Sequence, residues 1–321
     1  MDATASLDNT ITSKVLVLDR DTDCYATIKS FCERHHLVGL KAHEEHVMAV
    51  LRSNVDLGGI MLSESLAGLG EGGGGLGLAR RIREVRPELP IFLRRRRESA
   101  DTPLAERDSE LFSAVYRIED IDALAPAVAA SIFSQRYPNA LVRGIAEISR
   151  MVLERQFPGM SVEIEQPYLV RDRIIFGEVF TLIPLESSWC RGYMMLQAEQ
   201  KTLQALAPEE SGDFRNLNNA LGELTNLIWG WFKNRFINQS QPIQQLSQVP
   251  IIINHQHRYI SFGSEDAQLC FKYLLRKGDG DDAPLVLLQR FIFNLSWSPE
   301  DFIENQISVE DLFESGELEL F

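Results

Sequence analysis

Five short apolar runs, separated by stretches with helical periodicity, dominate the first 133 residues and constrain the fold more than any other feature. The first run, residues 14–18 (KVLVL), is too short for a helix and rich in Val and Leu, which is typical of a strand buried on both faces. Strands that alternate with helices form parallel sheets covered on both sides, so the sequence predicts a doubly wound α/β unit. The expected strands are 14–18, 37–41, 58–62, 90–93 and 114–118, and the expected helices are 22–35, 43–54, 76–85 and 121–133.

The second half of the chain has a different pattern, in which strands cluster between two long helices. A break is expected at 134–139, where Pro138 disfavours helical geometry at Tyr137. The pattern predicts an α+β unit with long helices packed on an antiparallel sheet. The expected helices are 140–156 and 214–236, and the expected strands are 161–166, 174–184, 193–197, 250–254, 258–262, 270–276 and 285–295.

Three segments follow from these patterns: an α/β domain over 1–135, an α+β domain over 136–298 and a C-terminal tail over 299–321. The tail has many acidic residues, no Lys or Arg, and regularly spaced apolar residues such as Phe302 and Leu312. Two interpretations of the tail stay open, an amphipathic segment docked on the body or on a partner, and a disordered segment.

Composition excludes several classes of function. The formal net charge of −14 argues against nucleic-acid binding, which needs local positive charge. No run approaches the roughly 20 apolar residues that span a bilayer, and residues 1–12 lack the apolar core of a signal peptide. The cysteines Cys24, Cys32, Cys190 and Cys270 form no CxxC pair, so we expect buried free thiols in a cytoplasmic protein. No histidine or acidic group has the spacing of a metal site.

One predicted helix carries a row of residues whose side chains can take part in catalysis. Asn219, Glu223, Asn226 and Gly230 are spaced by four, three and four residues, which places them on one face of the helix. We expect this row to face outward, because apolar residues follow the opposite face. They are Leu217, Leu221, Leu224, Ile228 and Phe232.

This row resembles the signature helix of the CheX/CheC-type chemotaxis phosphatases, in which Asn, Asp or Ser precedes Glu, Asn and Gly at the same spacings. The similarity covers roughly 139–298 and includes the flanking strands, although Asn219 stands where the family often has Asp or Ser. The resemblance implies a catalytic pair in which Asn226 orients the attacking water and Glu223 pairs with a lysine of the partner. Gly222 and Gly230 would let the partner's backbone come close.

The same resemblance implies the substrate and the assembly. The substrate would be a phosphorylated CheY-like response regulator of two-component or chemotaxis signalling, which supplies the aspartyl phosphate and its Mg²⁺. The chain would need no cofactor of its own, and a homodimer is expected because such domains commonly pair through their sheets. The alternative is a non-catalytic module that binds or sequesters a receiver, and the plainest interpretation of the row is a solvated helix face.

The N-terminal half resembles a response-regulator receiver domain that has lost its chemistry. Asp19 stands at the first acidic position, followed by Arg20 and then Asp21, and Ser63 or Glu64 stands where the phosphorylated aspartate belongs. Arg94 and Arg117 replace the residues expected after the fourth and fifth strands. The residues at 90–99 and 116–126 are also similar to the flavodoxin-like wing domain of the Orn/Lys/Arg decarboxylases. We therefore predict a degenerate receiver-like domain used for docking or dimerisation.

Three further patterns are interpreted as loops. The glycine-rich segment 70–77 has no P-loop lysine after it, and the acidic cluster 279–282 lacks the glutamate that closes a calcium loop. The basic run Arg94–Arg97 is interpreted as a solvated loop or as a contact for an acidic partner.

Overall fold

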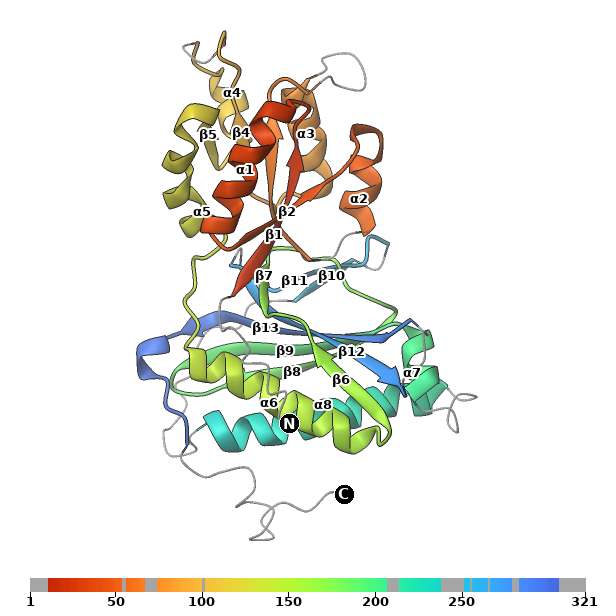
Figure 1. The fold of residues 1–321 in the computed structure, drawn as a ribbon. Helices are drawn as coiled ribbons and strands as arrows, with labels where there is room; N and C mark the ends of the chain where they lie inside the picture. The colour runs from red at the N-terminus through yellow and green to blue at the C-terminus, as the bar shows by residue number, and fades with distance from the viewer. Residues whose placement is uncertain are drawn as a thin grey trace, which may run out of the picture.

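The computed structural model describes residues 11–53, 56–66, 74–99, 102–206, 214–237, 251–254, 256–264, 266–278 and 283–305. Two units lie end to end and share a sheet (Figure 1). The strands are β1 Thr12–Leu18, β2 Leu37–Lys41, β3 Leu57–Ser63, β4 Ile91–Arg94, β5 Ala114–Tyr116, β6 Met160–Ile164, β7 Tyr168–Val170, β8 Val179–Glu186, β9 Cys190–Ala198, β10 Ile252–Asn254, β11 Tyr259–Ser261, β12 Gln268–Lys277 and β13 Leu285–Trp297. The helices are α1 Thr22–Arg34, α2 Val47–Ser53, α3 Gly75–Val85, α4 Glu106–Ser109, α5 Ala125–Ser131, α6 Asn139–Gln156, α7 Gln200–Leu206 and α8 Phe214–Phe236.

The N-terminal unit is a parallel sheet in the order β2-β1-β3-β4-β5, with helices on both faces, as predicted. Side chains alternate across the central strand. Val15 and Val17 pack beneath α1 and α5, whereas Leu16 and Leu18 pack beneath α2 and α3. Both sets are buried, which explains why this strand reads as a continuous apolar run rather than an alternating one.

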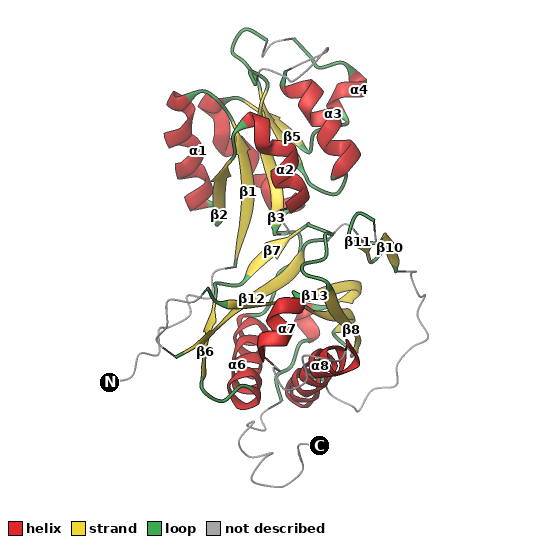
Figure 2. Cartoon of the chain, turned by 90° about the vertical axis from the view of Figure 1, so that its right-hand side faces the viewer, coloured by secondary structure: helices red, strands yellow, loops and turns green. Residues whose placement is uncertain are grey.

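The C-terminal unit is the predicted combination of long helices and antiparallel strands. Its strands follow the order β7-β12-β13-β9-β8, with β6 paired to β12. The helices α6 and α8 lie side by side on one face of this sheet (Figure 2). Strand β13 shows the division, because Phe291 and Phe293 join the helix-side core while Ile292 packs on the other face with Ile260 and Phe262.

The two units are joined strand to strand, which was not predicted. The amino end of β1 pairs in parallel with β7, with Thr12 opposite Tyr168 and Ser13 opposite Leu169. The hydroxyl of Ser13 also donates a hydrogen bond to the carbonyl oxygen of Leu169 at 2.7 Å. One eleven-stranded sheet therefore runs from β5 to β8, and the predicted boundary near 135 falls between α5 and α6.

A cluster of four buried charged side chains lies where the units meet. Arg86, after α3, contacts Glu88 through Nε at 2.6 Å and Asp172 through Nη2 at 3.0 Å. Arg290 of β13 donates from Nη1 to the backbone oxygen of Asp172 at 2.8 Å. Burial raises the pKa of Asp172 from 3.8 to about 6, although both arginines act in the opposite direction.

Some predicted elements differ from the observed ones. The strand expected at 174–184 begins only at Val179, because Gly177 adopts φ 69° and approaches Ala198 too closely for a side chain; a Cβ there would lie 2.0 Å from the Ala198 oxygen. The helix expected at 43–54 is a 3₁₀ turn at 44–46 followed by α2. The short elements α4, β7 and α7 were missed.

The cysteines are buried free thiols, as predicted. Burial raises the pKa of Cys32 and of Cys270 to about 11, so both thiols stay protonated and unreactive near neutral pH. No helix among the described residues is long and apolar enough to cross a membrane.

Candidate functional site

Helix α8 is anchored through the apolar face that the sequence predicted. Leu221, Leu224, Ile228 and Phe232 are all buried and belong to the core between α6, α8 and the sheet. The side chain of Leu217 lies outside the described residues. Apolar residues at intervals of three and four produce such a stripe, and its burial fixes which residues remain outside.

The opposite face of α8 presents the predicted row at the surface. The side chains of Asn219, Glu223 and Asn226 are exposed, and Gly222 and Gly230 are half-buried. A methyl group added at either glycine would meet nothing within 4 Å. The row is therefore accessible to another macromolecule, and the glycines leave room for a close approach.

The first residues of the C-terminal tail dock on the end of α8 rather than on this row. Phe302 packs on Phe236, and Glu304 pairs with Arg235 at 2.7 Å. Asn305 donates from its backbone N–H to the carbonyl oxygen of Arg235 at 2.8 Å. Since Arg235 follows Asn226 by nine residues, or about 13 Å along the helix axis, the docked segment leaves the row uncovered. The remaining tail, 306–321, lies outside the described residues.

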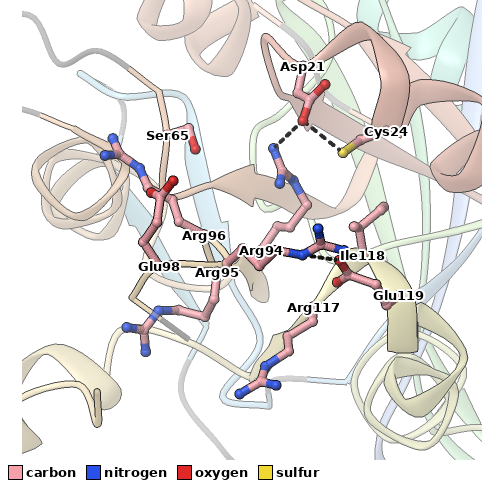
Figure 3. Close-up of a pocket in the computed structure, with 11 residues that line it drawn as sticks. Asp21, Cys24, Ser65, Arg94, Arg95, Arg96, Glu98, Arg117, Ile118 and Glu119 are labelled. Atoms are coloured by element: carbon pink, nitrogen blue, oxygen red, sulfur yellow. Dashed lines mark hydrogen bonds and ion pairs between the residues drawn. The ribbon is translucent and has the colours of Figure 1, made fainter. Parts of the chain in front are cut away.

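The degenerate receiver positions lie at the carboxyl ends of the parallel strands, and Figure 3 shows Asp21, Arg94 and Arg117 among them. Arg94, which ends β4, donates from Nε and Nη2 to the two carboxylate oxygens of Asp19 at 2.5 and 2.8 Å. Its Nη2 also donates to Ser63 Oγ, at the end of β3, at 2.9 Å. Burial alone would lower the pKa of Arg94, but the hydrogen bonds with Asp19 outweigh it and the pKa is raised. An internal guanidinium therefore neutralises the acidic residue of this pocket.

The other predicted positions line the mouth of the same pocket, a cavity of about 420 Å³. A carboxylate oxygen of Asp21 lies 3.9 Å from Nη2 of Arg94. The pKa of Asp21 is lowered, mainly because its carboxylate accepts a hydrogen bond from the Cys24 thiol. Arg117 also lines the cavity. The carboxylate of Glu64 accepts hydrogen bonds from the segment after β4, whereas the backbone N–H of Glu64 donates to the Arg94 carbonyl oxygen at 2.9 Å. Of Ser63 and Glu64, the Ser63 hydroxyl is the one that contacts the Arg94 guanidinium paired with Asp19.

The basic run Arg94–Arg97 is largely paired within the chain. Arg95 contacts Glu64 at 3.1 Å, and Arg97 contacts Glu119 at 2.7 Å across an exposed surface. Together with the Arg94–Asp19 pair, these contacts balance most of the positive charge. Among the described residues, no three His, Cys, Asp or Glu side chains gather as a metal site would require. Gly72 and the acidic cluster 279–282 lie outside the described residues.

One feature of the α8 site was missed at the level of sequence. Thr225, beside Asn226, is buried and hydrogen-bonded to Thr181 of β8. A mid-helix threonine at an inward position was the available signal, because such hydroxyls need a partner when buried.

No family model matches the chain, and no curated protein matches it. Solved structures align with part of it at low similarity. Response regulator TrrA of Thermotoga maritima, in complex with Mg²⁺ and beryllium fluoride, is 16% identical with a TM-score of 0.32, covering 38% of this chain and 100% of that one. A response regulator receiver domain from Clostridium thermocellum is 17% identical with a TM-score of 0.32, covering 38% and 95%. An adenylate cyclase structure from Rhodopirellula baltica is 14% identical with a TM-score of 0.32, covering 43% and 97%.

The strand order 2-1-3-4-5 of the N-terminal unit is by itself the doubly wound order found in receiver-like domains. The N-terminal unit therefore has a receiver-like fold, and its pocket lies where this fold places its functional residues, outside the carboxyl ends of the strands.

Proposed function

We propose that the C-terminal unit is a phosphatase that hydrolyses the aspartyl phosphate of a partner response regulator. The observation that carries the proposal is that Glu223 and Asn226 are both exposed, one helical turn apart, on a helix whose opposite face is buried in the core. A rigid helix can carry two such groups into another protein's pocket without rearranging, and pre-set geometry is the main requirement for phosphoryl transfer.

In the proposed reaction, the side-chain oxygen of Asn226 accepts a hydrogen bond from a water molecule and holds it in line with the phosphorus atom. The water oxygen forms the new bond to phosphorus while the bond to the aspartate oxygen breaks. The electron pair of the broken bond stays with the aspartate oxygen, which leaves a free carboxylate on the partner. The other product is inorganic phosphate, and one proton of the attacking water is released to solvent. Glu223 pairs with a cationic side chain of the partner and so fixes the approach, and the Mg²⁺ belongs to the partner.

The proposal assigns the aspartyl phosphate to a second protein for two reasons. The chain's own receiver-like unit has Ser63 where the acceptor carboxylate would stand, and its Asp19 is already paired with Arg94. In addition, its pocket lies at the carboxyl ends of the strands, whereas the amino end of β1 is fixed to β7. The carboxyl ends of these strands and α8 lie at opposite ends of the molecule (Figure 1).

The test is the lifetime of phosphorylated receivers with and without the protein. Each receiver of the host is labelled with radioactive phosphate, and its decay is followed with wild-type protein, with Asn226→Ala and with Asn234→Ala. Asn234 is a matched asparagine two turns further along α8, so its variant is expected to behave as wild type. We expect Asn226→Ala to slow decay about 100-fold, since misplacing a reactant by about 1 Å has an effect of that size.

Binding is measured separately with a receiver carrying beryllium fluoride as a phosphoryl mimic. Retained binding with lost acceleration in Asn226→Ala supports the catalytic role. If wild-type protein binds a receiver but leaves the lifetime of every phosphorylated receiver unchanged, the phosphatase proposal is wrong and the non-catalytic binding module replaces it.

A further inference from the structure

The turn of α8 that carries Glu223 and Asn226 also carries an inward hydroxyl. Thr225 is buried, and its Oγ1 lies 2.7 Å from the backbone oxygen of Leu221 and 2.6 Å from Oγ1 of Thr181. Thr181 lies on β8, the strand against which α8 packs. The contact therefore joins the helix to the sheet at the level of the exposed row.

The protons in this contact can be assigned from chemistry. Each threonine hydroxyl has one proton to donate. Thr225 donates its proton to the Leu221 carbonyl oxygen at 2.7 Å. Thr181 has two acceptors within reach, the Leu196 carbonyl oxygen at 3.4 Å and the Thr225 oxygen at 2.6 Å, and it donates to the nearer one. Both hydroxyls are then satisfied, and a directional bond ties α8 to β8. The surrounding Leu221, Leu224 and Ile228 side chains are apolar, and their contacts tolerate small rotations of the helix far better than a hydrogen bond does.

Small rotations of α8 matter for the proposed chemistry. Side-chain tips lie about 5–6 Å from the axis of a helix, so a rotation of about 10° displaces them by about 1 Å. A displacement of this size is enough to lower a rate about 100-fold when the reaction depends on a positioned water.

We propose that the Thr181–Thr225 hydroxyl pair is the positioning device that sets the rotation of α8 on β8, and with it the direction in which Glu223 and Asn226 point. The inference rests on the proposed function and deepens it. Neither threonine touches the partner; both act through the helix.

The experiment compares Thr225→Val, which keeps shape but removes the hydroxyl, with Thr225→Ser, which keeps the hydroxyl. The matched control is Thr202→Val, because Thr202 of α7 is also buried and its hydroxyl has no hydrogen-bond partner among the described residues. At saturating phosphorylated receiver, we expect Thr225→Val to lower the dephosphorylation rate 10- to 100-fold with the receiver Kd changed less than twofold. Thr225→Ser and Thr202→Val should retain the wild-type rate.

The double variant Thr181→Val/Thr225→Val separates positioning from stability. Replacing both partners by apolar groups of similar shape is nearly neutral for folding, so its Tm should return toward wild type while its rate stays low. A rate that recovers together with the Tm would show a merely structural role and overturn the inference.

Hydrogen exchange gives a readout that does not depend on activity. The amides of residues 223–227 should exchange faster in Thr225→Val than in Thr225→Ser. If wild-type protein accelerates no receiver's decay, the phosphatase proposal fails, and the positioning pair is then judged by exchange alone. Equal exchange in the two variants would refute the pair whatever the activity.

Discussion

Replacing Arg86 by Met tests whether the two units unfold as one. Arg86 belongs to the N-terminal unit but contacts Asp172 of the C-terminal unit, and both side chains are almost fully buried. The variant leaves the carboxylates of Asp172 and Glu88 buried without this cation. Removing one partner of a buried pair costs about 3–5 kcal/mol, which is a large part of the 5–15 kcal/mol typical of a folded protein.

The pH dependence of this loss follows from Asp172. Its native pKa of about 6 lies above its ordinary value of 3.8, mainly because burial disfavours the charged form. Arg86 and Arg290 lower this pKa and Glu88 raises it, but burial has the largest effect. Ionised Asp172 therefore costs stability above pH 6, by about 3 kcal/mol for a shift of this size, and the cost disappears as the pH falls toward 4. Without Arg86 the pKa rises further, so the deficit of the variant should be larger at pH 8 than at pH 5.

The assay is urea unfolding at both pH values, followed by tryptophan fluorescence and by far-UV circular dichroism. Fluorescence reports only on the C-terminal unit, because all tryptophans lie there, at Trp189, Trp229, Trp231 and Trp297. Arg80→Met serves as the control. Arg80 lies on α3, the helix that ends just before Arg86, and its ion pair with Asp108 is at the surface.

We expect Arg86→Met to lower the fluorescence-detected stability by about 3–5 kcal/mol and Arg80→Met by less than about 1 kcal/mol. A fluorescence transition that moves no further in Arg86→Met than in Arg80→Met would show that the units unfold independently. The coupling argued from the shared sheet and the buried cluster would then be wrong.

Two further predictions concern the glycines of the helices and the receiver-like pocket. Gly144→Ala should lower stability by about 1–3 kcal/mol, because the new methyl group would lie 2.4 Å from the Phe236 ring. Gly230→Ala should instead raise stability by about 0.5–1 kcal/mol and weaken receiver binding roughly tenfold. Thermal unfolding measures the stability of both variants, and binding titrations measure the affinity for the receiver. Arg94→Ala should lower stability by about 3–5 kcal/mol, because the buried carboxylate of Asp19 loses the guanidinium with which it pairs, and Arg94→Lys should cost less. Urea unfolding followed by circular dichroism measures both variants.

Much of the fold could be predicted because its elements carry strong local signals. The bounds of α8 and β2 agree with the expected 214–236 and 37–41, since one has a long apolar stripe and the other is bounded by turns. Strand β7 was missed because three residues carry no usable periodicity. Its pairing with β1 depends on contacts between residues about 155 positions apart, which local pattern cannot reveal.

The candidate sites divide in the same way. The row on α8 and the replacements at Ser63 and Arg94 follow from spacing and from position at strand ends, so the sequence was sufficient to name them. The partners of these residues were not predictable. In the sequence, nothing distinguishes Arg86 and Asp172 from charged residues of surface loops. Only the fold shows that their side chains meet in the interior. Thr225 likewise gained its role from a strand more than 40 residues earlier in the chain.

The residue types on the exposed face of α8 favour the proposed docking surface over a merely solvated face. A solvated face is best served by strong helix formers, yet this face has Gly222 and Gly230 together with Asn219 and Asn226. Compared with alanine at the same positions, these four residues together make the helix less stable by about 3 kcal/mol. Nothing within 4 Å of either glycine requires the absence of a side chain. Packing within the chain therefore does not require these glycines, whereas the partner docking that we propose would, and the opposite effects expected for Gly230→Ala on stability and on binding follow from that proposal.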